Sequence, residues 1–271
     1  MRRCLFSVYE LHDLTYRYPE ATALDGVTLS VARGERVAIL GANGSGKSTL
    51  LRVLAGLYFP AAGAVRFDGR DLTEDAFADE AFSFGFRRRV ALIFQNPDVQ
   101  LFNPTVFDEV AFGPLQLRWP HGEIVERVHL ALRDMGIEHL KDRAPHRLSG
   151  GEKKRVSLAS VLILDPDVLL LDEPTAALDP QSQSQTIDFL AENPGAKTIL
   201  TATHDLPVVG DIADRCVVFD AGRVVADGPP DTILHDEALL LRSHLLYRHR
   251  HRHASGEVHA HPHFPGGHRH T

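Results

Sequence analysis

The segment that decides the fold occupies residues 36–50 and reads RVAILGANGSGKSTL. Its first five residues form a short apolar run of the kind found in fully buried strands, and the residues after Ser48 have the pattern of a helix. A glycine-rich turn between a buried strand and a helix lets backbone N–H groups point at a phosphate, and the helix N-terminus adds a partial positive charge. The segment therefore predicts a P-loop within an α/β sheet.

The predicted P-loop assigns roles to individual residues. Lys47 is expected to neutralise the β- and γ-phosphates of a nucleotide, and the hydroxyl of Ser48 is expected to bind Mg²⁺. The other predicted contacts to the nucleotide come from Gly41, Asn43, Gly44, Ser45, Gly46 and Thr49. A glycine-rich turn with an unrelated lysine is the alternative, and the strand and helix on either side argue against it.

Two further apolar runs, at residues 168–171 and 198–203, extend the predicted sheet. Buried strands separated by helical segments predict a mainly parallel sheet that is covered by helices on both faces. The alternating segments 11–18 and 26–31 predict antiparallel strands with one solvated face. Between about residues 96 and 164 the periodicity becomes helical, which predicts a helical subdomain inserted into the sheet domain.

Two carboxylates follow the apolar run at residues 168–171. Ligands of parallel sheets gather at the carboxyl ends of the strands, so Asp172 and Glu173 are predicted to lie at the edge that binds the nucleotide. Asp172 is expected to hold Mg²⁺, usually through water, and Glu173 to polarise the attacking water. An acidic turn after a strand is common, so this prediction depends on the P-loop.

A second anion site is predicted where residues 148–152 read LSGGE. Ser149, Gly150 and Gly151 open a basic helix, so a hydroxyl, free backbone N–H groups and a helix dipole converge there. A helix that is merely capped by Ser149 is physically sound, but it leaves the pair of glycines unexplained. The segment is therefore predicted to bind an anion.

With these three segments in this order, the chain resembles the ABC ATPase family over about residues 8–240. The resemblance implies that Gln95 senses Mg²⁺ and the γ-phosphate, so that Ser48, Gln95 and Asp172 form the Mg²⁺ site. It also implies that Asp179 couples two nucleotide sites and that His204 contacts the γ-phosphate. Lys47, Gln95, Glu173 and His204 are then the predicted catalytic residues.

The resemblance further implies a dimer of ATPase subunits, which we expect to be identical. The two copies would dock head to tail, so that ATP on Lys47 of one copy is capped by Ser149 and Gly151 of the other. Tyr18 matches the aromatic residue that stacks on adenine, and Tyr16 is the second candidate because alternation puts both on one strand face. Closing and reopening of the dimer would move membrane helices.

Residues 92–114 resemble the energy-coupling-factor branch, whose members import vitamins and cobalt or nickel ions. This implies a transmembrane coupling subunit, held in an apolar groove after Gln95, and a substrate-binding membrane subunit. Phe102 and Phe107 are groove candidates, although ordinary core packing could explain either one. The chain departs from the branch at Glu152, where glutamine is usual, at Ala177, a position often held by glycine, and in a long connection at 71–89.

Length and composition limit the possible functions. A chain of 271 residues can bury a full core without a disulfide or a metal, and its two cysteines, Cys4 and Cys216, are expected to be reduced thiols. The net charge of −7 argues against a nucleic-acid partner. No apolar run reaches the roughly 18 residues that cross a bilayer. A membrane role must come through partners, so we expect a peripheral protein on the cytoplasmic face.

The composition changes at about residue 248, which separates a predicted ATPase domain (1–247) from a tail (248–271) that is predicted to be disordered. Neutral imidazole suits Ni²⁺ and Co²⁺, so the histidine-rich tail favours import of a transition metal. A low-complexity tail without a metal function is the alternative. The candidate ligands alternate with other residues and are His249, His251, His253, His259, His261 and His263.

Other functions compete with metal import. The same ATPase could serve a vitamin importer. A GTPase that delivers nickel to enzymes would need a guanine-reading Asn-Lys-x-Asp segment, which this chain lacks. ABC ATPases of DNA repair or translation, which do not transport, usually carry paired nucleotide domains, coiled-coil insertions or zinc modules. We therefore predict the ATP-hydrolysing subunit of an importer for cobalt or nickel.

Overall fold

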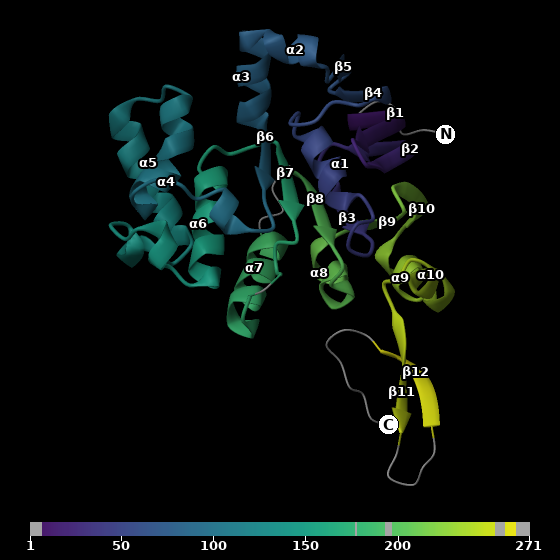
Figure 1. Ribbon diagram of the computed structural model, residues 1–271. Coiled ribbons are helices and arrows are strands. Elements are labelled where there is room, and N and C mark those ends of the chain that lie inside the picture. Colours follow the sequence, from purple (N-terminus) through teal and green to yellow (C-terminus); the bar gives the residue numbers. More distant parts are fainter. Residues whose placement is uncertain (1–6, 177, 193–196, 253–257, 264–271) are drawn as a thin grey trace.

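The structure of the chain, a computed structural model, describes residues 7–176, 178–192, 197–252 and 258–263. In this part of the chain a six-stranded sheet has the order β10-β9-β3-β8-β7-β6 (Figure 1). Its strand pairs are parallel except for β9 with β10, which confirms the predicted mainly parallel sheet. The strands are β3 (Arg36–Leu40), β6 (Val90–Ile93), β7 (Val168–Asp172), β8 (Thr198–Thr203), β9 (Arg215–Asp220) and β10 (Arg223–Gly228).

Alternate side chains of the central strands enter two hydrophobic cores, one on each face of the sheet. Ile39 and Leu170 lie in the core that includes α1 (Lys47–Leu54). Their neighbours Leu40 and Leu171 lie in the other core. A fully buried side chain of this kind stabilises the fold by about 1.5–3 kcal/mol relative to an exposed one. Burial on both faces explains why these strands are apolar throughout, and it fixes the loops at their carboxyl ends.

The second core is completed by helices on its outer side. Leu190, Val209 and Leu240 belong to three of them and are buried. These helical elements are α7 (Pro180–Glu192), η4 (Leu206–Val208), α8 (Val209–Ile212), α9 (Pro230–Leu234) and α10 (Glu237–Arg242).

An antiparallel sheet with the order β2-β1-β4-β5 packs against α1 through the first core (Figure 1). Both predicted strands are present and longer than their alternating segments, because β1 and β2 form one hairpin whose pairing runs from Ser7↔Ala32 to Tyr18↔Ala21. This confirms the antiparallel β subdomain. The strands are β1 (Ser7–Tyr18), β2 (Ala21–Ala32), β4 (Ala62–Phe67) and β5 (Arg70–Asp71).

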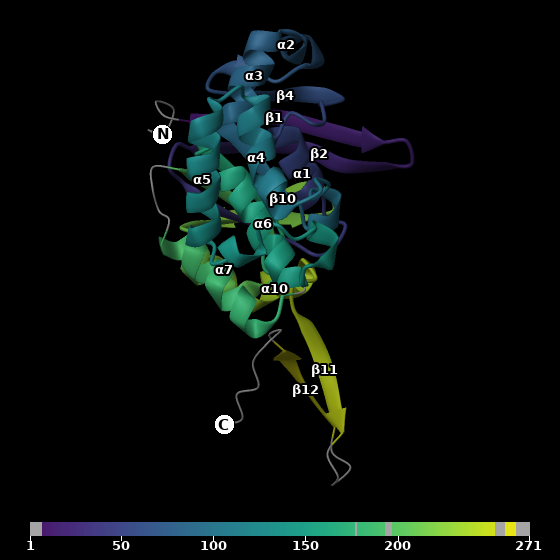
Figure 2. The ribbon, with the colours of Figure 1, turned by 90° about the vertical axis from the view of Figure 1, so that its left-hand side faces the viewer.

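Three helices form the predicted inserted subdomain around a core of their own (Figures 1 and 2). The helical periodicity is borne out, because Ile124, Val128 and Leu132 are buried in that core. The helices are α4 (Val106–Gln116), α5 (His121–Asp134) and α6 (Gly150–Leu162), with the short turns η1 (Pro97–Val99), η2 (Glu138–Leu140) and η3 (Pro145–Arg147).

The long connection at 71–89 forms two helices, α2 (Glu74–Ala78) and α3 (Glu80–Arg89). Phe77 lies edge to face with Phe82 and Phe86. It also fills the space beside Gly56, where an added Cβ atom would come within 2.2 Å of the Phe77 ring. The extra residues therefore anchor the antiparallel sheet at the end of α1.

The C-terminal segment differs from the predicted disordered tail. Strands β11 (Tyr247–Arg252) and β12 (Val258–His263) pair antiparallel, and both views show them projecting away from the rest of the molecule (Figures 1 and 2). A β-ladder satisfies backbone hydrogen bonds without an apolar core, which composition alone does not reveal. A lone two-stranded hairpin is only marginally stable in water. His253 lies outside the described residues.

Candidate nucleotide site

The P-loop follows β3 as predicted. Two of its glycines are required because a Cβ atom at either position would clash with neighbouring atoms. Gly46 has φ 106°, and a Cβ atom there would lie 2.5 Å from the carbonyl oxygen of Ala23. At Gly41, an added Cβ atom would lie 2.4 Å from Ser45 Oγ. Only glycine permits this close approach of backbone segments, while Asn43 and Gly44 lie at the exposed tip of the loop.

The loop encloses a buried cation and a buried hydroxyl. Lys47, which is 5% exposed, donates to the carbonyl oxygens of Gly41 and Ala42 at 2.7 and 3.0 Å. Burial lowers the pKa of its ammonium. The hydroxyl of Ser45 is buried without a hydrogen-bond partner in the described chain. A cation and an unpaired donor at a helix N-terminus fit a phosphate group.

The predicted Mg²⁺ residues lie partly together. Ser48 Oγ donates to Asp172 Oδ1 at 2.9 Å. The hydroxyl and the carboxylate are therefore close enough to bind the same metal ion. Burial raises the pKa of Asp172. Gln95 is exposed and makes no hydrogen bond to any described residue, although it lies just beyond β6, which pairs in parallel with β7. Oxygen ligands at one sheet edge fit Mg²⁺.

Glu173 is the most constrained residue of the site. It is 4% exposed and has φ 46°, a left-handed conformation that costs roughly 1–3 kcal/mol for a residue other than glycine. Its Oε1 lies 2.8 Å from His204 Nδ1 and 3.9 Å from Lys47 Nζ. Its Oε2 accepts a hydrogen bond from Thr203 Oγ1 at 3.2 Å. These contacts therefore fix the orientation of this carboxylate beside the P-loop.

Thr203 was not among the predicted site residues. Its signal was available, since Thr203 ends the strand β8 that was predicted, and β8 pairs in parallel with β7. Thr203 also accepts from the backbone N–H of Asp205 at 3.0 Å, which fixes the turn that presents His204. His204 itself keeps half of its side chain exposed, at 50%. It is thus bonded to Glu173 on one side and open to solvent on the other.

The contacts of the aromatic residues near the P-loop distinguish between Tyr18 and Tyr16 as the residue that stacks on adenine. Tyr18 shares a hydrogen bond with Thr49 Oγ1 at 3.2 Å, which ties it to the first turn of α1. Tyr16 instead stacks on Tyr58, with ring centroids 5.1 Å apart and planes 7° apart. Tyr18 lies edge-on to both rings. One face of Tyr16 is therefore covered, which favours Tyr18, and Tyr58 is a neighbour that the sequence did not point to.

The second predicted anion site lies at the start of α6, where the structure shows the capped helix that was the alternative interpretation. Ser149 caps the helix in a capping box with Glu152, because each side chain accepts from the other's backbone N–H. The bond from the Ser149 N–H lowers the pKa of Glu152. A glutamine at this position could form the same capping box, so the cap does not account for the glutamate. Gly150 is exposed, while a Cβ atom at Gly151 would lie 2.4 Å from Ser182 Oγ.

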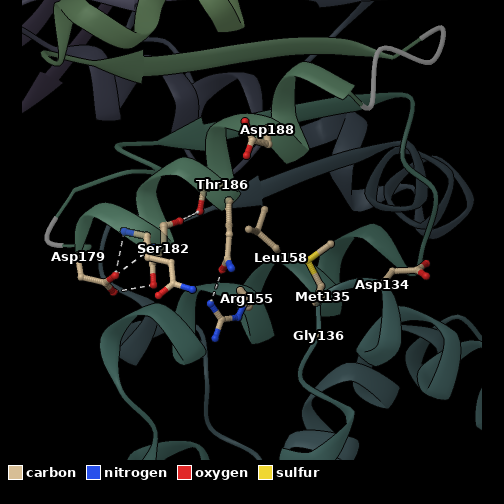
Figure 3. Close-up of a pocket in the computed structure, with 11 residues that line it drawn as sticks. Asp134, Met135, Gly136, Arg155, Leu158, Asp179, Ser182, Thr186 and Asp188 are labelled. Carbon is tan, nitrogen blue, oxygen red and sulfur yellow. Dashed lines mark hydrogen bonds between the residues drawn. The ribbon is translucent and has the colours of Figure 1, made fainter.

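Asp179 lies beside Ser182 (Figure 3) and close to Gly151, where an added Cβ atom would be 3.6 Å from Asp179 Oδ2. It accepts hydrogen bonds from the backbone N–H and the hydroxyl of Ser182, at 3.0 and 2.6 Å, and so begins α7. Arg155 of α6 donates to Gln185 of α7 at 3.0 Å. A cavity of about 620 Å³ opens between these helices and the end of α5. The start of α6 and the start of α7 therefore form one bonded surface.

Among the residues whose side chains the structure describes, which do not include those of the C-terminal hairpin, there is no group of three or more residues that could bind a metal ion. Of the tail candidates, His249 and His251 lie on β11 and are register partners of His261 and His259 on β12. His263 is the partner of Tyr247. No helix of the described residues has the length and apolarity needed to cross a membrane.

Comparison with known proteins places these features in a family. The family model described as ABC transporter matches residues 24–176, which include the P-loop, the Ser149–Gly151 turn and the two carboxylates after β7. The chain is 56% identical over 243 residues to the nickel import ATP-binding protein NikO of Rhodobacter capsulatus, covering 88% of this chain and 95% of that protein. It is 44% identical over 238 residues to the energy-coupling factor transporter ATP-binding protein EcfA of Methanothermobacter thermautotrophicus, covering 87% and 75%.

Solved structures show the same architecture. CbiO1 of Clostridium perfringens, described as part of the ABC transporter complex CbiONQ, superposes with a TM-score of 0.75 at 39% identity, covering 88% of this chain and 94% of that one. A dimeric ATP-binding cassette in a post-hydrolysis state, bound to ADP and Pi, superposes with a TM-score of 0.73 at 27% identity, covering 82% and 98%. The predicted fold class is thereby confirmed.

Proposed function

The chain belongs to the ABC transporter ATPase family, and from this premise we propose that it is the ATP-hydrolysing subunit of an energy-coupling-factor importer of nickel or cobalt ions. The observation that carries the catalytic part is the Glu173 carboxylate, held by Thr203 and His204 within 3.9 Å of the P-loop lysine. The branch and the cargo rest on the named activities of its relatives NikO and EcfA.

The proposed chemistry is an in-line attack of water on the γ-phosphate. Glu173 would orient and polarise this water, because its carboxylate is fixed in direction by Thr203 and His204. Lys47 would exchange its two carbonyl partners for phosphate oxygens, which bind an ammonium more strongly. Mg²⁺, which Ser48, Gln95 and Asp172 would hold, supplies neutralisation of the phosphate charge when bound.

We infer a head-to-tail dimer from the division of the site. Ser149 and Gly150 lie exposed at the N-terminus of α6, and the described chain shows no contact between them and the P-loop residues. An exposed helix N-terminus with free N–H groups is suited to the γ-phosphate of a second copy. The bonded surface formed by the start of α6 and the start of α7, which includes Asp179 and Ser182, would lie in the same dimer interface. Each catalytic site would then use residues of both copies.

The surface proposed for the membrane partner follows Gln95. Phe102 and Val99 are each 66% exposed, and Phe102 lies edge to face with Phe112, which is 37% exposed. A neighbouring cavity of about 560 Å³ lies between α3 and α4 and is lined by Phe84, Phe112 and Leu164 among others. Phe107, in contrast, packs against the core of the helical subdomain. Exposed apolar side chains in a cluster indicate a protein-docking surface, which would place the chain at the cytoplasmic face of the membrane.

We also propose that the C-terminal hairpin binds Ni²⁺ or Co²⁺. Its register sets His249 opposite His261 and His251 opposite His259. Residues two apart on a strand share a face of the backbone, and directly opposite residues are neighbours, so these four positions gather on one face. Imidazole is a ligand for both metals. Such a site would buffer the cargo or regulate the pump.

The test of this function is uptake. Cells that produce the chain with its membrane subunits should accumulate radioactive nickel or cobalt, and the Lys47→Ala variant should abolish accumulation. Glu138→Gln, which alters a surface ion pair, is the matched control and should transport normally. Uptake of a labelled vitamin in place of either metal would reassign the cargo. A failure to transport any of these ligands while ATP is hydrolysed would contradict the importer.

A further inference from the structure

The segment that carries Gln95 is bonded to α6 at three places. Lys154 Nζ donates to the carbonyl oxygen of Phe94, the residue before Gln95, at 3.1 Å. Lys153 Nζ lies 2.6 Å from Asp98 Oδ1. Gln100 Nε2 donates to the carbonyl oxygen of Ser157 at 3.2 Å and contacts the Ser160 hydroxyl at 3.3 Å. The helix that begins at the second anion site therefore holds the whole of residues 94–100.

The three bonds differ in their surroundings. The side chains of Lys153 and Asp98 are 17% and 60% exposed, so water screens their attraction. Lys154 is 2% exposed, and its ammonium makes a single hydrogen bond in the described chain, although it has three N–H donors. Removing the only partner of a buried cation is costly, because water cannot replace it. Of the three contacts, the Lys154 hydrogen bond therefore costs the most free energy to break if residues 94–100 move away from α6.

Lys154 also lies in the electrostatic field of two carboxylates of the nucleotide site. Burial lowers the pKa of its ammonium to about 8, and Asp172 and Glu173 oppose this shift. Neither carboxylate lies close enough to form an ion pair with it, since the Phe94 carbonyl is its single bonded partner among the described residues. The lysine thus stands between the end of β6, the end of β7 and the start of α6.

We propose that Lys154 is a positioning residue that makes residues 94–100 and α6 move as one body, so that engagement of Gln95 at the nucleotide of its own copy sets the position of Ser149 for the nucleotide of the second copy. This inference rests on the proposed head-to-tail dimer. The reason is energetic: if the segment moved without the helix, the buried ammonium would lose its carbonyl partner. Occupation of one nucleotide site is thereby communicated to the other half of the dimer.

The experiment measures two quantities in the full chain carrying Glu173→Gln: ATP affinity of the monomer and the dissociation constant of the ATP-bound dimer. Lys154→Met should leave ATP affinity within about twofold, because Lys154 is not expected to touch the cis nucleotide, and should weaken the dimer tenfold or more. Lys154→Gln retains an N–H donor for the Phe94 carbonyl and should restore most of the dimer. Lys153→Met, which removes the exposed pair, is the matched control and should have little effect.

A double-mutant cycle separates positioning from a general loss of packing. If Lys154 acts through Gln95, Lys154→Met should add little to the dimer weakening caused by Gln95→Ala. Full additivity of the two changes would overturn the proposal, as would an equal loss of ATP affinity and dimer affinity in Lys154→Met. Should Lys154→Met fail to fold, Lys154→Gln with weak dimerisation would count equally against it. Absence of an ATP-bound dimer in Glu173→Gln alone would instead refute the proposed function.

Discussion

At the P-loop edge of the sheet, Lys47 and Glu173 are 5% and 4% exposed and are bonded to neighbours within the chain, whereas Ser149 and Gly150 at the start of α6 face solvent. Both regions are suited to bind a γ-phosphate. The P-loop region would do so through a buried cation, and the start of α6 through free N–H groups. In the proposed head-to-tail dimer, a single copy would therefore build one half of the site as part of its core and present the other half on its surface. Changes in the buried half should impair each copy, while changes in the exposed half should act only on the partner.

The largest effect is expected at the buried half. Glu173→Gln keeps the shape of the side chain but cannot accept a proton, so ATP hydrolysis should fall about 10³-fold, within the range of a lost general base. The variant should elute as an ATP-bound dimer in size-exclusion chromatography, while the wild type remains mainly monomeric. Glu138→Gln is the control for a surface carboxylate. Hydrolysis within a few-fold of wild type would remove Glu173 from the catalytic role.

The exposed half is tested by Ser149→Arg, which fills the surface that would meet the second copy. Hydrolysis should fall by about 100-fold or more, as when donors to a transition state are lost. Binding of ATP to the monomer should stay nearly intact, which isothermal titration would measure. Mixing this variant with Lys47→Ala should restore one composite site per heterodimer, and thus partial hydrolysis if a single site suffices. Weaker ATP binding by the Ser149→Arg monomer would contradict the division into two halves.

A smaller effect is expected at the edge of the buried half, where Tyr18 would stack on adenine. Stacking of a base on an aromatic ring contributes about 1–3 kcal/mol, so Tyr18→Ala should weaken ATP binding about tenfold or more. Tripolyphosphate, which lacks a base, should bind the variant as it binds the wild type. Tyr16→Ala is the comparison. If Tyr16→Ala alone lost ATP affinity, the adenine would lie on the second candidate.

The smallest effect on catalysis is expected from the hairpin, which belongs to neither half. Truncation after Tyr247 should leave the melting temperature and ATP hydrolysis unchanged, because both views show the hairpin apart from the sheet (Figures 1 and 2). The full chain should bind Ni²⁺ at pH 7.5 and lose it at pH 5.5, since free histidine protonates near pH 6.5. Isothermal titration of both chains tests this. Equal binding by the truncated chain would exclude the hairpin as the metal site.

Local signals predicted much of the fold and of the site. The apolar runs before the P-loop and before Asp172 identified β3 and β7, because both faces of these strands are buried. The same signals missed Thr203, Tyr58 and Lys154, whose significance depends on neighbours that are distant in sequence. They also missed the pairing of the C-terminal strands, because a backbone ladder needs no apolar composition.

The sequence by itself determined where phosphate, Mg²⁺ and water chemistry could occur, because glycine-rich turns, a lysine and paired carboxylates at strand ends have consequences that depend on local geometry. Only the tertiary structure decided how these pieces are held: a left-handed Glu173 fixed by Thr203 and His204, and a buried Lys154 that joins two segments 60 residues apart. Such contacts depend on which strands and helices become neighbours. Which elements become neighbours is determined by the burial of apolar side chains on both faces of the sheet, and this burial depends on the whole chain.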